Sequence, residues 1–249
     1  MSPFWVTAFV DFEADDFDAG VDFWRRVTGY AVSEPRGETG EVATLLPRDG
    51  DAFLRVQRLG DGLGRIHLDL HVADPRAAAA AATRLGAVEI ADVGYVVMRS
   101  PGGFTFCFVT DPLAHRPPPT RWPGGHAALV DQVCLDIPPR LYEAEVTFWQ
   151  AVTGWERRPS ATALDEFASL QRPPAIPLRL LLQRLDDDAP TVIAHLDLAT
   201  TDRDAEVARH LALGAELGPR HGHWTVLTDP AGSAYCITER SPDTGMLAP

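Results

Sequence analysis

Residues 23–30 read FWRRVTGY, and residues 148–155 read FWQAVTGW, so the same pattern returns 125 positions further along the chain. Three more pairs follow in the same order. The tetrapeptide HLDL occupies 67–70 and 195–198, LGA occupies 85–87 and 213–215, and a proline with a cysteine six residues later occurs at 101–107 and 230–236. Since the offset drifts only from 125 to 129, we predict two homologous copies with small loop insertions.

The two copies are separated by a segment rich in proline and glycine, RPPPTRWPGG at residues 116–125. Proline favours extended backbone and glycine releases it, as is typical of a connection between domains. We therefore predict a first domain at 1–115, a linker at 116–126 with the boundary near 120, a second domain at 127–241 and a tail at 242–249.

Hydrophobic periodicity within each copy alternates between that of strands and that of helices, which predicts an α+β fold. Pro75 suits the first turn of a helix, and Gly86 suits the position just past its end. Expected strands of the first copy are 4–12, 41–46, 52–59, 65–72, 95–98 and 104–109, and expected helices are 17–27 and 75–85. The second copy is expected to repeat this order, with helices near 142–152 and 202–213.

Charge and composition narrow the possible partners. The chain has 22 basic and 35 acidic residues, a formal charge of −13, so it should repel nucleic acid at long range. Its beginning lacks the basic region of a signal peptide, and no apolar run reaches the roughly 20 residues that span a bilayer. The three cysteines do not form a disulfide framework. These features predict a cytoplasmic protein with reduced cysteines and no membrane partner.

The quoted motifs resemble those of the glyoxalase-like domains of the vicinal oxygen chelate superfamily, which also includes bleomycin resistance proteins and ring-cleaving dioxygenases. One departure is Ser100, where the second copy has Asp229 in the motif Asp-Pro-x-Gly-x-x-x-Cys. The resemblance implies two tandem domains, each made of two βαβββ modules that form a curved mixed sheet around a cup, with the helices outside. It also implies that a small organic molecule binds in the cup.

Strand alternation assigns faces to the candidate binding residues. In residues 65–72, Leu68 and Leu70 share one face, while His67 and Asp69 share the other and are expected to line the cup. By itself, a buried aspartate such as Asp69 is more often a structural hydrogen-bond acceptor than a general base. The full set of expected ligand-binding residues is Phe9, Asp11, Gln57, His67, Asp69, Cys107, Asp136, Gln183, His195 and Asp197.

The resemblance also implies four metal-ligand positions in each copy. These are Phe9, Gln57, His67 and Cys107 in the first copy, and Cys134, Gln183, His195 and Cys236 in the second. Phenylalanine cannot bind a metal and an amide is a poor ligand for a transition metal, so no metal is expected in the first copy. Cys134, His195 and Cys236 form a soft donor set, which is compatible with one zinc, iron or nickel ion in the second copy. The alternative is that these residues are buried and bind no metal.

Two functions remain open at this point, beside the less attractive alternative that the tandem is only a scaffold. One is a binding protein that holds a small organic molecule without the usual metal in the first domain. The other is a metal-dependent lyase or isomerase with its site in the second domain. The implied ligand positions lack the glutamates of ordinary glyoxalase I and the second histidine of extradiol dioxygenases, which argues against both activities. The tandem arrangement is expected to form a monomeric pseudo-dimer or a homodimer.

Overall fold

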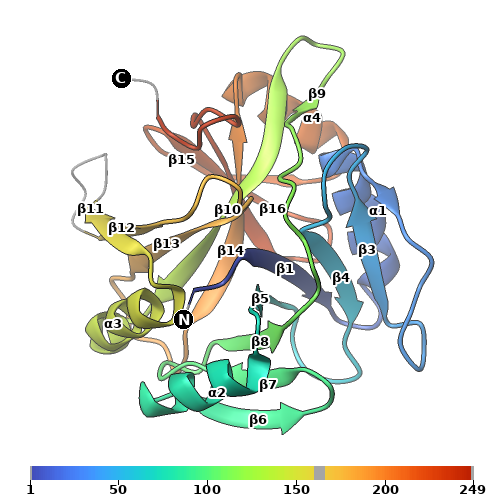
Figure 1. Ribbon diagram of the computed structural model, residues 1–249. Coiled ribbons are helices and arrows are strands. Elements are labelled where there is room, and N and C mark those ends of the chain that lie inside the picture. Colours follow the sequence, from blue (N-terminus) through green and yellow to red (C-terminus); the bar gives the residue numbers. More distant parts are fainter. Residues whose placement is uncertain (1, 160–165, 248–249) are drawn as a thin grey trace. The chain divides into compact units, whose positions relative to one another are not determined.

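The computed structural model describes residues 2–159 and 166–247, so the last two residues of the predicted tail lie outside the described residues. Figure 1 traces the elements along the chain. The first copy contains β1 (Trp5–Phe12), α1 (Phe17–Thr28), β2 (Ala31–Val32), β3 (Val42–Leu46), β4 (Leu54–Arg58), β5 (Arg65–His71), α2 (Pro75–Arg84), β6 (Val88–Asp92), β7 (Val96–Arg99) and β8 (Thr105–Val109).

The second copy repeats this order. After a short strand β9 (Thr120–Arg121) come β10 (Ala127–Ile137), a 3-10 turn η1 (Pro139–Leu141), α3 (Tyr142–Thr153), β11 (Glu156–Pro159), β12 (Phe167–Gln171), β13 (Arg179–Arg184), β14 (Ile193–Thr200), α4 (Arg203–Ala212), β15 (Glu216–Arg220), β16 (Trp224–Thr228) and β17 (Ala234–Thr238). The predicted α+β class and the tandem repetition are confirmed.

Each copy supplies one mixed β-sheet. The strand order is β2-β3-β4-β1-β5-β8-β7-β6 in the first sheet and β11-β12-β13-β10-β14-β17-β16-β15 in the second, with β9 paired to β10. Near the centre of each sheet two strands run parallel: β5 beside β8, and β14 beside β17. The two orders match strand for strand, as expected of homologous copies.

Equivalent residues begin and end the helices of the two copies. Asp74 and Asp202 precede α2 and α4, and each carboxylate accepts the backbone N–H three residues further on. Gly29 and Gly154 follow α1 and α3 with φ of 72° and 68°, a left-handed conformation that glycine adopts without steric cost. These local signals explain why the predicted helix bounds agree with the structure to within one or two residues.

The edge strands β2 and β6 have no counterpart among the predicted strands. β2 has only two residues, and β6 is exposed at every position except Ala91. An exposed strand has no buried face, and therefore no alternation of apolar and polar residues that would mark it in the sequence.

By internal contacts the chain divides into two compact units, which do not coincide with the two copies. The described part of unit 1 lies within Met1–Phe9, His67–His115 and Val133–Ala194. It therefore combines the second half of the first copy with the first half of the second copy. Its core is aromatic: the ring of Phe106 on β8 meets those of Phe148 and Trp149 on α3, edge to face.

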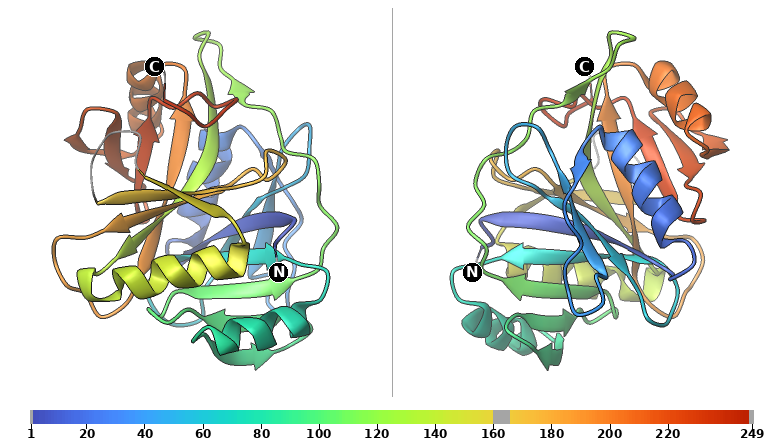
Figure 2. Two further views of the ribbon diagram at one scale, coloured as in Figure 1. Left: turned by 60° about the vertical axis from the view of Figure 1, so that its left-hand side comes forward. Right: turned by 90° about the vertical axis from the view of Figure 1, so that its right-hand side faces the viewer.

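Unit 2 takes the complementary halves, and its described part lies within Val10–Ile66, Arg116–Gln132 and His195–Pro249. Helices α1 and α4 lie side by side in this unit, as the right-hand view of Figure 2 shows, and the Arg209 guanidinium donates to the carbonyls of Arg26 and Val27. Trp24 of α1 packs against Tyr235 of β17. In each unit, then, the first helix of one copy covers the last strand of the other.

The predicted linker is an ordered part of unit 2. Thr120 donates its hydroxyl to the Thr28 carbonyl at the end of α1, and the Trp122 ring lies 3.6 Å below the guanidinium of Arg209. Arg116 donates to two carbonyls of residues 242 and 243 in the tail. The segment thus fastens the end of α1 to α4 and to the tail.

Candidate functional site

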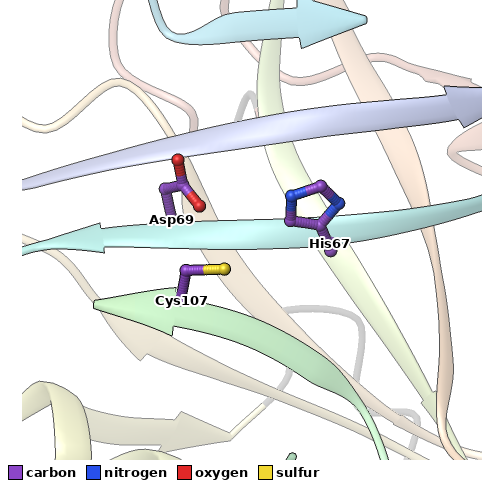
Figure 3. A group of neighbouring side chains, drawn as sticks. All are labelled: His67, Asp69 and Cys107. Atoms are coloured by element: carbon purple, nitrogen blue, oxygen red, sulfur yellow. The ribbon is translucent and has the colours of Figure 1, made fainter. Parts of the chain in front are cut away.

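A histidine, an aspartate and a cysteine lie together on the two parallel strands of unit 1. His67 and Asp69 are two residues apart on β5 and so share a face, and Cys107 lies opposite Asp69 in the register with β8. Figure 3 shows the three side chains on these neighbouring strands. Their ligand atoms lie within 4.8 Å of one another, and all three residues are buried.

The first strand of the same unit places an aromatic ring on this cluster. Phe9 stacks on the His67 imidazole, with 4.3 Å between the ring centroids and 19° between the planes. The ring occupies a position at which the resemblance in sequence implied a metal ligand. One face of the imidazole is therefore covered by an apolar surface.

Unit 2 contains the equivalent cluster. Asp197 on β14 lies opposite Cys236 in the register with β17, as Asp69 lies opposite Cys107. His195 Nε2 is 3.3 Å from Asp197 Oδ1 and 3.6 Å from Cys236 Sγ. Both neighbours approach the same ring nitrogen, so the three residues do not form a relay of the Cys–His–Asp type, which needs one partner on each nitrogen.

Residues that the sequence prediction missed hold the second oxygen of Asp197. The Gln132 amide donates to Asp197 Oδ2, and Arg240 Nη1 is 3.8 Å from the same oxygen. Arg240 is itself held by a bidentate pair with Asp131, at 2.5 and 3.3 Å. Burial alone would raise the pKa of Asp197, but the hydrogen bond and charge of His195, with Arg240 and Gln132, lower it below its usual value. Asp197 is therefore an anion in a buried position.

A signal for part of this set is present in the sequence. Gln132 has the same parity as Cys134 and Asp136 in β10, and Arg240 has the same parity as Cys236 two residues beyond the end of β17. Continuing the alternation of faces toward the start of β10 and past the end of β17 would have placed Gln132 and Arg240 on the candidate face. Asp131 has the opposite parity, and its pairing with Arg240 is visible only in the folded chain.

The remaining predicted residues are spread over both units. In unit 1, the Cys134 thiol lies 3.5 Å from the Gln183 side-chain oxygen and 3.7 Å from Asp136 Oδ1, so its one S–H has two acceptors within reach. In unit 2, buried Asp11 accepts a hydrogen bond from Arg65 at 3.1 Å, and Gln57 on β4 pairs with β3. By internal contacts Cys134 is assigned to unit 1, and His195 and Cys236 are assigned to unit 2.

Comparison with protein families follows the repetition seen in the sequence and in the sheets. The model of the glyoxalase-like domain matches residues 7–109 and again residues 132–238. The chain belongs to the glyoxalase-like domain family. No curated protein matches this glyoxalase-like chain by sequence.

Solved structures with the same fold include a synthase, a glyoxalase and a dioxygenase. A triple mutant of 4-hydroxymandelate synthase from Streptomyces coelicolor is 15% identical with a TM-score of 0.64, over 96% of this chain and 94% of that chain. The Mn(II)-bound glyoxalase from Novosphingobium aromaticivorans is 18% identical with a TM-score of 0.61, over 92% and 80%. A homoprotocatechuate 2,3-dioxygenase variant from B. fuscum is 15% identical with a TM-score of 0.65, over 99% and 75%. Identities this low establish a shared fold alone.

The comparisons confirm the predicted membership of the vicinal oxygen chelate superfamily and the tandem copies. Among the described residues of this glyoxalase-like chain, no helix has both the length and the hydropathy of a membrane-spanning segment.

Proposed function

We propose that the glyoxalase-like chain binds one divalent zinc ion through His195, Asp197 and Cys236, and that a small organic molecule binds beside it. The observation that carries this proposal is the spacing of the donors around His195 Nε2, 3.3 Å to Asp197 Oδ1 and 3.6 Å to Cys236 Sγ. Donors at roughly 2.0–2.3 Å from a tetrahedral zinc ion are separated from one another by roughly 3.3–3.6 Å. The two distances from His195 Nε2 therefore match those between zinc ligands, and the three donor atoms all lie within 4.8 Å of one another.

The type of donor favours zinc over a harder cation. Imidazole, thiolate and carboxylate together suit zinc, with iron and nickel as the other candidates, whereas magnesium and calcium prefer oxygen ligands alone. Three protein ligands leave a fourth tetrahedral position for water or substrate, as in catalytic zinc sites. Cys134, which the sequence suggested as a ligand, is not needed for this set.

The surroundings of Asp197 support its role as a ligand. Its Oδ2 atom is held by Gln132 and faces Arg240, and this leaves Oδ1 directed at His195. Hydrogen bonds to the outer oxygen of a ligating carboxylate fix its orientation, which raises metal affinity. The first copy has Thr7 and Asp111 where the second has Gln132 and Arg240, so the support is specific to the second copy.

The first copy supports binding without a metal. Phe9 covers one face of His67, so the cluster of His67, Asp69 and Cys107 combines an apolar wall with a few polar groups. This combination is typical of sites for small organic ligands. We propose that the His67 cluster binds a small organic molecule, whereas the His195 cluster carries the metal-dependent reaction.

Zinc bound at the second cluster would act as a Lewis acid toward an oxygen atom of the substrate, which suits a lyase or isomerase. Gln132 and Arg240 would keep the Asp197 carboxylate in place and ionised. The enclosing β-sheet would limit access of water.

A second candidate function is binding of an organic molecule without metal in either unit. Its support is the pairing of Arg240 with Asp131 and Asp197, because the buried charges already compensate one another within the protein. The experiment below separates the two functions.

We expect untagged protein purified without chelator to contain about one zinc ion per chain, measured by elemental mass spectrometry. His195→Ala should reduce the content to below roughly a tenth of an equivalent, because it removes the central ligand. His67→Ala is the matched control, since it changes the same residue of the other copy, and it should retain the metal.

Less than about a tenth of an equivalent in the wild type, with no thermal shift on adding zinc, would contradict the metal proposal and support the metal-free function. Equal loss of zinc in His195→Ala and His67→Ala would contradict specific binding of the metal at the His195 cluster.

A further inference from the structure

In both units a buried carboxylate joins the tryptophan of the first helix to the turn before the last strand, yet the two carboxylates come from different places. In unit 2 the turn supplies it. Trp24 on α1 donates its indole N–H to Asp229 Oδ2 at 2.9 Å, and Asp229 Oδ1 accepts the backbone N–H groups of Ala231 and Ser233 at 3.0 and 2.9 Å.

In unit 1 the helix supplies it. Trp149 on α3 donates its indole N–H to Glu145 Oε2 at 2.8 Å, and Glu145 Oε1 accepts the backbone N–H of Gly102 in the turn between β7 and β8 at 2.6 Å. Glu145 is fully buried, like Asp229, and it forms the same two kinds of hydrogen bond. The carboxylate therefore comes from the helix in unit 1 and from the turn in unit 2, but in both units it accepts from the indole and from the backbone of the turn.

The two positions of the first copy that are equivalent to Glu145 and Asp229 carry no carboxylate. Gly20 stands where the second copy has Glu145, and Ser100 stands where it has Asp229. A Cβ atom on Gly20 would lie 2.3 Å from the Phe12 ring, so no side chain fits there, whereas the second copy has the smaller Ile137 in place of Phe12. Each helix thus either carries the carboxylate or leaves no room for one.

The turns are adapted in the same way. A Cβ atom on Gly102 would lie 3.0 Å from the Glu145 carboxylate and 2.6 Å from Val192. The second copy has Ala231 at this position, in the turn that supplies its own carboxylate. The turn of the first copy is therefore shaped to receive a glutamate from a helix.

We propose that the placement of this carboxylate makes each helix–turn surface specific for the other copy, so that the halves of the chain pair across the repeats and reject a second copy of themselves. If the first copy paired with itself, Trp24 would meet Ser100 and lack its anionic acceptor. If the second copy paired with itself, Glu145 and Asp229 would both be buried at one indole. A buried donor without its acceptor and two adjacent buried carboxylates are each strongly unfavourable.

Both carboxylates are costly to bury in their charged form. Burial raises the pKa of Glu145 and of Asp229, although hydrogen bonds from the turn and the indole oppose that increase. The donors at each site therefore offset only part of the cost of burying one carboxylate, so a second carboxylate at the same place would add a further cost.

The test moves the carboxylate within the full chain. Glu145→Gly alone and Ser100→Asp alone should each lower Tm by roughly 5–10 °C, the first by removing the acceptor and the second by burying two carboxylates together. The double variant S100D/E145G should recover most of the loss, because it recreates in unit 1 the arrangement of unit 2. Additive losses in the double variant would overturn the proposal, since the two carboxylates would then not be equivalent.

Specificity itself is tested by refolding. In S100D/E145G both copies have a glycine in the helix and an aspartate in the turn, so a copy can also pair with the same copy of a second chain. After dilution from denaturant we expect at least about twice the wild-type share of larger species by size-exclusion chromatography. An unchanged share of larger species would overturn the proposal that the carboxylates make pairing specific. If Glu145→Gly does not fold, Glu145→Gln, which preserves the shape of the side chain, provides a folded reference.

Discussion

Arg240→Met is expected to lower the free energy of unfolding by about 3–5 kcal/mol, because it leaves the buried carboxylate of Asp131 without its bidentate cation and removes one of the two basic groups beside Asp197. The same change is expected to weaken zinc binding about 10-fold or more, since it removes one of the groups that fix the Asp197 carboxylate. Urea unfolding and competition with a zinc-binding dye measure the two effects.

The effect of Arg240→Met has a defined dependence on pH. The pKa of Asp197 is lowered in the folded protein, so its stabilisation is present above the pKa of the unfolded chain and is lost as the pH falls through the folded pKa. The difference between wild type and variant should therefore narrow below about pH 4. Arg220→Met is the control: it makes the same substitution in an exposed pair with Asp204 and should cost less than about 0.5 kcal/mol. Equal losses at the two sites would contradict the account of Arg240.

Glu206→Gln is the second substitution with a large expected effect. Glu206 of α4 is fully buried and contacts three basic side chains: Arg209 at 2.7 Å, His126 at 2.7 Å and His210 at 2.9 Å. Replacing the carboxylate by a neutral amide leaves these three side chains without the anion that they share. We expect this to lower the free energy of unfolding by about 3–5 kcal/mol. Chemical denaturation at neutral pH measures the loss, and Asp204→Asn, at an exposed position of the same helix, should be nearly neutral.

The pH dependence of the wild type reports on the same group. Burial alone would raise the pKa of Glu206, but hydrogen bonds and charges from Arg209 and His210 lower it from 4.5 to about 2. The carboxylate therefore contributes stability of about 3 kcal/mol above pH 4.5, which is lost as the pH falls toward 2. The pKa of His210 is lowered by burial, which Glu206 only partly offsets, so protonation of the unfolded chain lowers stability below about pH 6.5 as well. Glu206→Gln should lack the decrease between pH 4.5 and 2; a profile parallel to the wild type would contradict this assignment.

Much of the candidate site follows from strand alternation. His67 and Asp69 share a face because they are two residues apart in a strand, and the same spacing in the second copy gives His195 and Asp197. The cysteines join them because β8 and β17 run parallel to β5 and β14 in the same register. That register depends on strand pairing over long distances, which local periodicity does not determine.

The ion pairs around the site could not be predicted in the same way. Asp131 and Arg240 are separated by more than a hundred residues, and in the sequence either residue alone is most simply an exposed charge. β10 and β17 lie on either side of β14 in the second sheet, which brings these two residues together in the folded chain. Only the folded chain shows that Asp197 has a neighbouring cation and an amide donor.

The sequence by itself determined the number of copies, the order of their elements and the positions where the helices end. These features depend on local physics: the periodicity of buried faces, aspartates that precede helices, and glycines that adopt a left-handed conformation. The tertiary structure alone decided that each compact unit is built from halves of both copies. The reason is that pairing is selected by shape and charge at buried contacts, such as Glu145 beside Gly102 in one unit and Asp229 beside Trp24 in the other, and the two copies are too similar elsewhere for their periodicity to indicate which halves fit.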